Sequence, residues 1–290
     1  MIISVQNYLS IIYNKLFELH LEGEKLKNKL KILLFVVNIL FIIFLFGENV
    51  SSMSTGYNMT TIKNLDTTEE VTRDRKKAIY LTFDDGPNKK ITNEMLDILK
   101  ENDVKATFFL IGNLIEGVED VVKRIDDEGH SIGLHTYTHK FKKIYSNEDK
   151  FIEEMLDCRN EINKVVGISP NIIRFPGGSS QHLSNNFLNR LHNNEFKIYD
   201  WNMENSDGVN AKLSPDKLYR KAIKGSKDLS TIILLMHCTP INTNTCKALP
   251  QIIEYYKSQG YEFKAITEDT TELYFPMTKK TFSFLRDINN

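Results

Sequence analysis

Two adjacent carboxylates, Asp84 and Asp85, are the residues of this chain whose positions most clearly suggest chemistry. They lie in the stretch IYLTFDDGPNKK, where a β-prone apolar run leads directly into the acidic pair, a glycine and a proline. Neighbouring negative charges at the mouth of a core repel each other and resist desolvation, so they normally need a cation or a shared proton. Asp, Gly and Pro also form strand-ending turns. The stretch by itself therefore leaves two interpretations open, a metal site and a structural turn.

Two histidines, His135 and His139, follow another β-prone run in the segment HTYTH. Their spacing lets both imidazoles reach one cation from a turn or from a first helical turn. Further along the chain, Arg174 comes shortly before a Pro-Gly-Gly segment, and His237 ends an apolar run. A histidine after an apolar run is usually a structural core residue, so His237 alone does not indicate catalysis.

Seven short β-branched or aromatic runs would position these side chains, and they alternate with segments of helical period. This alternation predicts a parallel sheet with right-handed crossovers. Because no G-x-G-x-x-G turn is present, the pattern fits a barrel better than a dinucleotide-binding sheet. Functional sites of such barrels lie at the carboxyl ends of the strands, which is where these polar residues stand. The runs cover residues 78–83, 105–112, 131–136, 171–176, 196–202, 230–237 and 261–267.

Five short motifs, TFDDGP, HTYTH, RFPGG, WNMENSD and LMH, occur in this order within residues 78–267. In their order and approximate spacing they resemble the polysaccharide deacetylase family, the nodulation-protein-B-like carbohydrate esterases. The first two motifs match closely, the fifth is short, and the third and fourth depart from the usual pattern. The resemblance implies a distorted seven-stranded (β/α) barrel that removes N- or O-acetyl groups from sugars with one divalent metal ion.

Carried over by position, the resemblance implies Asp85, His135 and His139 as the metal ligands and Asp84 as the general base. One aspartate and two histidines leave coordination positions open for water and the acetyl oxygen, as catalytic zinc sites require. We therefore expect one divalent cation, Zn²⁺ in the first place, with Co²⁺ or another divalent cation as the alternative.

Three further catalytic roles follow from the resemblance. His237 matches the acid that protonates the departing amine. Arg174 matches an arginine that holds the base carboxylate, although an ordinary salt bridge at the barrel rim is the alternative. Asp207, the second acidic residue of WNMENSD after Glu204, would orient and tune His237 as a triad carboxylate does.

Two positions depart from the family pattern. Gly177 stands where an aromatic residue often follows the proline, and Gly208 stands at the usual tryptophan. The backbone N–H of Gly177 can still help to bind an oxyanion, since that role needs no side chain. Trp201, the single tryptophan, is expected to line the groove. The loss of two rings predicts a wider or differently shaped cleft.

An apolar span at residues 31–47 is preceded by a cluster of lysines. Lysines before an apolar span favour an N-in, C-out orientation, and the span is slightly shorter than the ~20 residues of a typical membrane helix. We expect a cytoplasmic lead at residues 1–30, a single transmembrane anchor at 31–47 and a polar linker at 48–76. This places the catalytic domain outside the cell, on the membrane. A cleaved signal peptide and a secreted mature protein are the alternative.

The composition bounds the remaining choices. The chain has 290 residues, 41% of them hydrophobic, and a formal net charge of -1, so no global field favours nucleic acid as a partner. We expect one barrel domain at residues 77–270 and an appended tail at 271–290. Three cysteines do not form a disulfide scaffold, although a bridge between Cys238 and Cys246 stays open.

The expected function is the removal of N-acetyl groups from an extracellular glycan. Peptidoglycan is the expected substrate, because an anchor with a short linker would hold the domain close to the wall. Three alternatives stay open: an O-acetyl esterase acting on a polysaccharide, an inactive wall-binding protein on the same fold, and an amidohydrolase whose substrate is not a glycan.

Overall fold

The computed structural model describes residues 77–277. The lead, the transmembrane anchor and the linker expected for residues 1–76 lie outside the described residues, as does most of the expected tail. Within residues 77–277, no helix combines the length and the apolar character that crossing a membrane requires.

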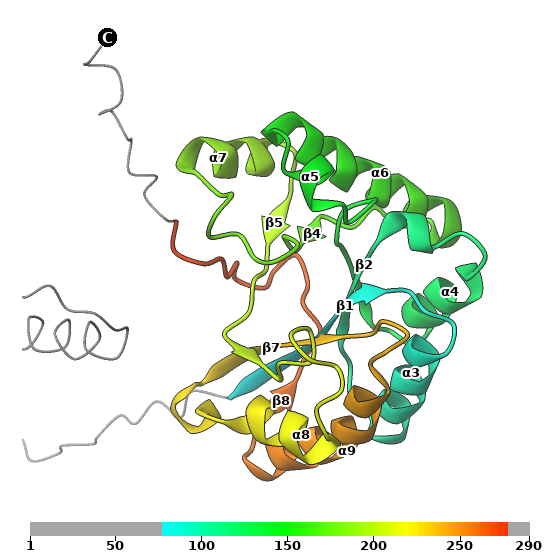
Figure 1. Ribbon diagram of the computed structural model, residues 1–290, viewed down its shortest axis with the longest axis vertical. Helices are drawn as coiled ribbons and strands as arrows, with labels where there is room; N and C mark the ends of the chain where they lie inside the picture. The colour runs from blue at the N-terminus through cyan, green and yellow to red at the C-terminus, as the bar shows by residue number, and fades with distance from the viewer. Residues whose placement is uncertain (1–76, 278–290) are drawn as a thin grey trace, which may run out of the picture. The chain divides into compact units, whose positions relative to one another are not determined.

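The described chain is built on one curled parallel sheet (Figure 1). The strands follow the order β5-β4-β3-β2-β1-β7-β6, and β8 pairs with the beginning of β1. Every predicted run overlaps one of these strands, β1 extends three residues beyond its run, and β6 lies within the WNMENSD motif as an additional strand. The strands are β1 (Ala78–Gly86), β2 (Thr107–Leu110), β3 (Ser131–Leu134), β4 (Ile172–Ile173), β5 (Lys197–Ile198), β6 (Met203–Glu204), β7 (Thr231–His237) and β8 (Glu262–Phe263).

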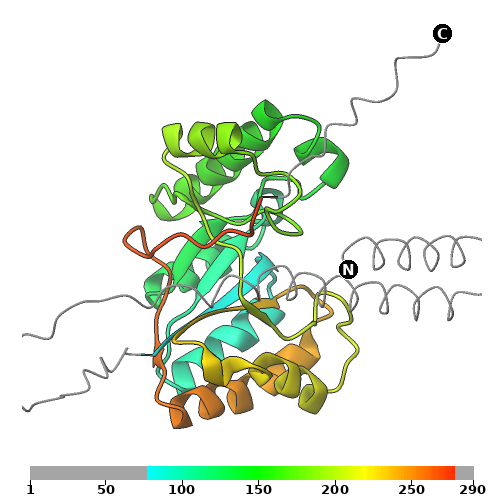
Figure 2. The same ribbon diagram turned by 90° about the vertical axis from the view of Figure 1, so that its left-hand side faces the viewer.

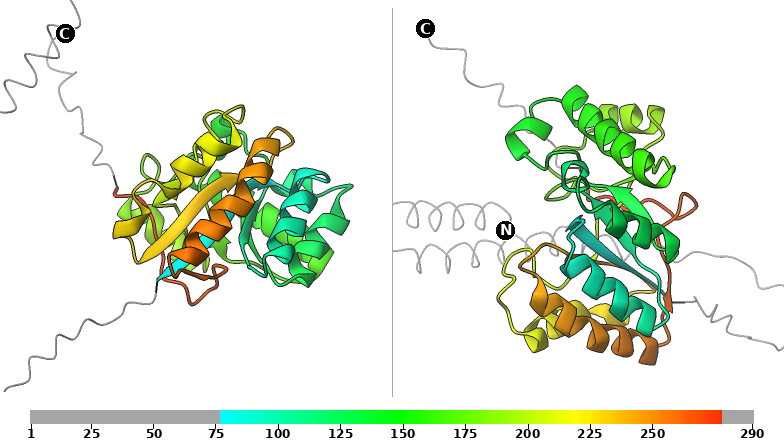
Figure 3. Two further views of the ribbon diagram at one scale, coloured as in Figure 1. Left: turned by 90° about the horizontal axis from the view of Figure 1, so that it is seen from below. Right: turned by 90° about the vertical axis from the view of Figure 1, so that its right-hand side faces the viewer.

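Helices cover the outer side of the sheet. Helix α8 packs on α9, α9 on α3, α3 on α4, and α4 on α6. Two further views show α6 and α7 beyond one end of the sheet and α8 and α9 beyond the other (Figures 2 and 3). The helices are α3 (Ile91–Glu101), α4 (Glu119–Asp127), α5 (Phe141–Ile144), α6 (Glu148–Val166), α7 (Asn185–Asn193), α8 (Pro215–Ile223) and α9 (Thr243–Ser258), with short 3₁₀ turns at η1 (Gly112–Leu114) and η2 (Ser226–Asp228).

Local sequence signals set the bounds of α6, the helix that later supports the site. The side chain of Asn147 accepts a hydrogen bond from the backbone N–H of Lys150, which caps the first turn. Gly167 ends the helix in the left-handed region, with φ of 73°, a conformation that costs glycine nothing. Between these ends, Phe151, Met155 and other apolar residues at helical spacing turn one face into the core.

The two ends of the sheet, β5 and β6, are joined directly in sequence but belong to opposite edges of the strand order. The predicted parallel (β/α) arrangement is confirmed, but the sheet has eight strands rather than seven, and its curl stays open between these two edges. Asn202, between β5 and β6, bonds to β7 through main chain and side chain: its N–H donates to the carbonyl oxygen of Ile233, and its Oδ1 accepts from the N–H of Ile233.

The first residues of the expected tail lie along this open edge. Leu273 forms an isolated parallel bridge with Tyr199, and the N–H of Phe275 donates to Asp200 Oδ2 at 2.7 Å. The orange and red end of the ribbon in Figure 1 follows this path past β5. All three cysteines of the chain are free and buried, so the disulfide left open for Cys238 and Cys246 does not form.

Candidate functional site

The acidic pair sits on a bulge at the carboxyl end of β1. The register with β2 shifts between Asp84 and Gly86, and Asp85 has φ of 68°. In a regular strand, neighbouring side chains point to opposite faces, so only one of the two carboxylates could face the site. A bulge residue in the left-handed region breaks this alternation and re-aims its side chain. Both carboxylates consequently line the same cavity.

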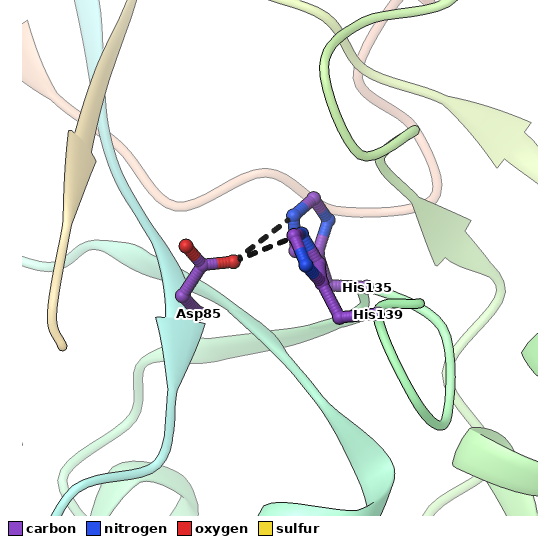
Figure 4. Close-up of side chains that lie close together, drawn as sticks. All are labelled: Asp85, His135 and His139. Carbon is purple, nitrogen blue, oxygen red and sulfur yellow. Dashed lines mark ion pairs between the residues drawn. The ribbon is translucent and has the colours of Figure 1, made fainter. Parts of the chain in front are cut away.

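Asp85 faces the two predicted histidines (Figure 4). Its Oδ1 atom lies 3.4 Å from His135 Nε2 and 3.3 Å from His139 Nε2. The donor atoms of the three side chains lie within 4.8 Å of one another. One carboxylate and two imidazoles at this spacing are a typical ligand set for a divalent transition metal.

The surroundings of these ligand atoms fit a cation. His135 Nδ1 lies 2.9 Å from the carbonyl oxygen of Arg174, which can only accept, so the proton is on Nδ1 and the Nε2 lone pair faces the site. Within the described residues, Asp85 Oδ1 is buried and has no hydrogen-bond partner. Burial acts to raise the pKa of Asp85, but the contact and charge of His135 and the charge of His139 outweigh it and lower that pKa to about 2. The carboxylate is thus ionised and available as a ligand.

The loop that carries the histidines is bound by the buried carboxylate of Glu154 on α6. Thr136 and His139 have φ of 68° and 53°, and Thr136 Oγ1 accepts from the N–H of His139. Glu154 on α6 accepts from the N–H groups of Tyr137 at 3.1 Å and Thr138 at 2.7 Å. The Glu154 side chain therefore satisfies two backbone donors of a loop in a sparsely populated conformation.

Asp84 is paired with a fully buried arginine. Arg174 Nη1 donates to Asp84 Oδ1 at 2.8 Å and to Thr82 Oγ1 at 2.7 Å. The rest of its fork faces the open edge of the sheet, where Nε donates to the carbonyl oxygen of Tyr199 and Nη2 to that of Asp200. The pairing with Asp84 is therefore through one nitrogen rather than bidentate, because the main chain between β5 and β6 takes the other donors. Asp84 Oδ2 is left facing His135 Nε2, at 3.8 Å.

His237 and Asp207 form a second pair. The ring Nδ1 lies 2.7 Å from Asp207 Oδ1, and Asp207 Oδ2 accepts from the N–H of His237 and from Thr245 Oγ1. Burial acts to lower the pKa of His237, but the hydrogen bond and charge of Asp207 outweigh it and raise that pKa to about 9. The buried carboxylate thus holds the ring in one orientation and favours its protonated form.

The structure brings the residues predicted for the site into one cavity of about 310 Å³. Asp84, Asp85, His135 and His139 line one part of it. Gly177, Trp201, Asp207 and His237 also line it, and Arg174 lies buried against Asp84.

Gly208, where the family pattern has tryptophan, lies against the ring of His237. A Cβ atom at this position would lie 2.4 Å from His237 Cε1, which is closer than carbon atoms approach. In this structure the ring of His237 therefore occupies the space that a side chain at residue 208 would need.

Among the contacts of the site that were not predicted from the sequence, two come from residues of helices, Glu154 and Thr245. Glu154 had a usable signal: it lies between Phe151 and Cys158 on the buried face of α6, where an acidic residue needs a partner. Thr245, which donates to Asp207, has no such signal, because a threonine in a helix is common.

A curled parallel sheet with paired carboxylates, a histidine pair and an Asp–His pair at the carboxyl-end rim defines a hydrolase type of active site. The sequence profile of the polysaccharide deacetylase family matches residues 72–197. A peptidoglycan-N-acetylglucosamine deacetylase of Bacillus cereus is 37% identical over 205 residues, which are 70% of this chain and 72% of the relative. The peptidoglycan-N-acetylmuramic acid deacetylase PdaA of Bacillus subtilis is 30% identical over 199 residues, 67% of this chain and 73% of the relative.

Solved structures agree with these relatives. The crystal structure of a polysaccharide deacetylase from Bacillus cereus matches with a TM-score of 0.61 and 36% identity, covering 70% of this chain and 97% of that one. The catalytic domain of a peptidoglycan N-acetylglucosamine deacetylase from Eubacterium rectale matches with a TM-score of 0.64 and 29% identity, covering 70% and 94%. The chain belongs to the polysaccharide deacetylase family. It is a hydrolase of the kind that acts on carbon–nitrogen bonds other than peptide bonds.

Proposed function

We propose that the protein is a metal-dependent N-deacetylase of peptidoglycan that works outside the cytoplasm. The observation that carries this proposal is the Asp85–His135–His139 cluster, with Asp84 and His237 in the same cavity. The names of the relatives from Bacillus cereus and Bacillus subtilis support peptidoglycan as the substrate class.

The cation would be held by Asp85, His135 and His139. We expect Zn²⁺ first, because histidine nitrogen and carboxylate oxygen atoms are among the ligands that zinc takes in proteins. When bound, such a cation polarises a carbonyl oxygen and lowers the pKa of water. The His135 tautomer fixed by the carbonyl oxygen of Arg174 keeps one ligand nitrogen ready without a rearrangement.

Asp84 is the base in this proposal. Its Oδ1 atom is held by Arg174, and its Oδ2 atom faces the ligand cluster and can take a proton from the attacking water. The hydrogen bond from the guanidinium to Oδ1 holds the carboxylate in place while Oδ2 takes the proton.

His237 is the acid. With a pKa of about 9, its ring is protonated at neutral pH and can deliver a proton to the departing amine. Asp207 holds Nδ1, so the proton is donated from Nε2. The N–H of Gly177 would help to bind the oxyanion, and Trp201 would form part of the sugar wall.

The test is acetate release from purified peptidoglycan by the full-length protein loaded with zinc, followed by mass spectrometry of the muropeptides. The expected result is a loss of acetyl mass from N-acetylated sugars. Acetate from O-acetylated wall, with N-acetyl groups intact, would establish an esterase instead. Binding to the wall without acetate release would establish a binding protein on this fold.

We also propose the domain division expected from the sequence, with a lead at residues 1–30, an anchor at 31–47, a linker at 48–76, the catalytic domain at 77–270 and the tail at 271–290. The apolar span behind a lysine cluster supports the anchor. The full-length protein should fractionate with membranes and resist release by high salt, because burial of an apolar span exceeds an electrostatic surface contact. A soluble mature form that lacks residues 31–47 would establish a cleaved signal instead.

A further inference from the structure

A tight turn of the main chain lies at the wall of the active-site cavity. The N–H of Gly178 donates to the carbonyl oxygen of Phe175 at 2.9 Å, so residues 175–178 form a four-residue β-turn. Proline fixes φ at about −65° in the second position, and Gly177 has φ of 76° in the third. This combination defines a type II turn, whose central peptide joins Pro176 to Gly177.

The two ends of this turn are anchored separately from its central peptide. Phe175 is fully buried, and the N–H and Oγ of Ser179 both donate to the buried carboxylate of Asp200. A rotation of the central peptide by about 180° would convert the type II turn into a type I turn, with φ of about −90° at Gly177. Glycine adopts either sign of φ, so residue 177 does not by itself exclude this change. The direction of the Gly177 N–H therefore depends on what the central peptide contacts.

The central peptide is bound by Tyr145, which follows the last residue of α5. The Tyr145 hydroxyl donates to the carbonyl oxygen of Pro176 at 2.6 Å. Because the C=O and N–H of a trans peptide point in opposite directions, this hydrogen bond turns the Gly177 N–H away from Tyr145. Within residues 77–277, no protein acceptor takes a hydrogen bond from that N–H. Gly177 lines the active-site cavity, whereas Tyr145 does not.

Three neighbouring rings fix the side chain of Tyr145. It stacks on the rings of Phe151 and His182, and it packs edge to face on Phe141 with 5.7 Å between the ring centroids. Phe141 in turn lines the cavity. Burial, together with the charge of Asp200, raises the pKa of Tyr145 above its usual range, so its hydroxyl remains a donor at neutral pH. The hydrogen bond to the turn is thus made by a side chain with little freedom to move.

We propose that Tyr145 is a positioning residue of the reaction: its hydroxyl group fixes the Pro176–Gly177 peptide so that the Gly177 N–H faces the oxyanion. The inference rests on the proposed function and deepens it, because it names the group that orients the oxyanion donor. In a rotated peptide, the carbonyl oxygen of Pro176 would take the place of the N–H and repel the developing negative charge. Packing of the Tyr145 ring alone would require no hydroxyl group.

The kinetic test uses Tyr145→Phe, which removes the hydroxyl group and keeps the ring. In the full-length, zinc-loaded protein, kcat should fall about tenfold on a soluble N-acetylated peptidoglycan fragment and on 4-nitrophenyl acetate alike, because both reactions pass through an oxyanion. Removal of an oxyanion donor costs about 10²–10³-fold, and the expected loss is smaller because the N–H is still present. KM and the zinc content should change by less than about twofold, since the oxyanion forms only after the substrate has bound.

The orientation of the peptide can be measured independently of the reaction. Pro176–Gly177 is the only Pro-Gly pair of the chain, so protein with ¹³C-labelled proline and ¹⁵N-labelled glycine gives a single NMR signal that joins the two residues. In a type II turn the N–H of the third residue lies close to the Hα of the second, and in a type I turn it lies farther away. In the metal-free full-length protein, the nuclear Overhauser effect between these two hydrogens should be strong, and Tyr145→Phe should weaken it.

Tyr256→Phe is the matched control, because the Tyr256 hydroxyl also donates to a main-chain carbonyl oxygen, that of Ala222 at 2.7 Å, and Tyr256 does not line the cavity. It should leave kcat and the Overhauser effect unchanged.

Five results would overturn the role of Tyr145 and leave the proposed function intact. They are an unchanged kcat in Tyr145→Phe, a loss through KM alone, a loss on the glycan alone, an unchanged Overhauser effect, and an equal loss of kcat in Tyr256→Phe. Loss of zinc in Tyr145→Phe would also overturn it, because the tyrosine would then support the ligand loop. No turnover of either substrate by the unaltered protein would overturn the proposed function and the role of Tyr145 together.

Discussion

Replacement of Glu154 should weaken metal binding although this residue is not a ligand. Its carboxylate is buried and accepts from the N–H groups of Tyr137 and Thr138, which lie between His135 and His139. Burial acts to raise the pKa of Glu154, but hydrogen bonds from Lys143 and Thr138 outweigh it and lower that pKa, so the acceptor is charged.

The contacts set the size of the effect. A hydrogen bond to a charged group contributes about 1.5–3 kcal/mol, so two backbone donors together account for about 3–6 kcal/mol. The ion pair with Lys143 is left out of this sum, because the lysine side chain is 43% exposed. In Glu154→Gln an amide oxygen can keep one acceptor but not the charge, so part of this energy is lost. Changes in groups that support metal ligands typically reduce metal affinity about 10- to 100-fold.

The assay is a zinc titration of the metal-free full-length protein against a competing chelator, with thermal unfolding of the metal-free form measured in parallel. Glu154→Gln should raise the dissociation constant for zinc about 10-fold or more. Glu153→Gln is the control, since Glu153 is the preceding residue of α6 and its side chain is exposed. A lower unfolding temperature with unchanged zinc affinity would refute the reasoning, because Glu154 would then support the helix packing alone.

Three further predictions concern single side chains. Asp84→Asn should retain zinc and lose about 10²–10⁴-fold in kcat, because general-base catalysis has that size; loss of the metal would show that the two aspartates are assigned in the wrong order. His237→Ala should cost more on an N-acetyl sugar than on 4-nitrophenyl acetate, since an amine leaves poorly without a proton; equal losses on both substrates would remove the acid role. Burial lowers the pKa of His130 from 6.5 to about 4, and its Nδ1 accepts from the N–H of Ala106 only while unprotonated. Stability is then complete above about pH 6.5 and should fall by up to about 3 kcal/mol as the pH drops to 4, and urea unfolding of His130→Asn should lack this decrease.

The positions of the strands were predictable because each buried run of β-prone residues is bounded by polar or turn-forming residues. The gathering of Asp85, His135 and His139 was predictable for a related reason: parallel strands end at one rim, so polar residues that follow them meet. The order of the motifs then separated His237 from the many histidines that only fill a core.

Other features depend on geometry that a pattern of residue types does not carry. The bulge at Asp85 is a one-residue change of register, and the sequence of β1 continues without interruption through it. The opening between β5 and β6 arises because each edge pairs for two residues only. Phe141 looked like an ordinary apolar residue of a short helix, and only its place beside His139 and Gly177 makes it part of the site.

Arg174 serves the site through two separate parts of itself. Its side chain fixes Asp84, whereas its backbone carbonyl oxygen fixes the proton of His135. A main-chain carbonyl is present whatever residue occupies the position, so the hydrogen bond to His135 Nδ1 does not depend on the side chain at residue 174. Substitution can remove the support of the base while the ligand tautomer is inherited unchanged. In the proposed metal site, a substitution at residue 174 would therefore impair the base and leave the hydrogen bond that orients His135 in place.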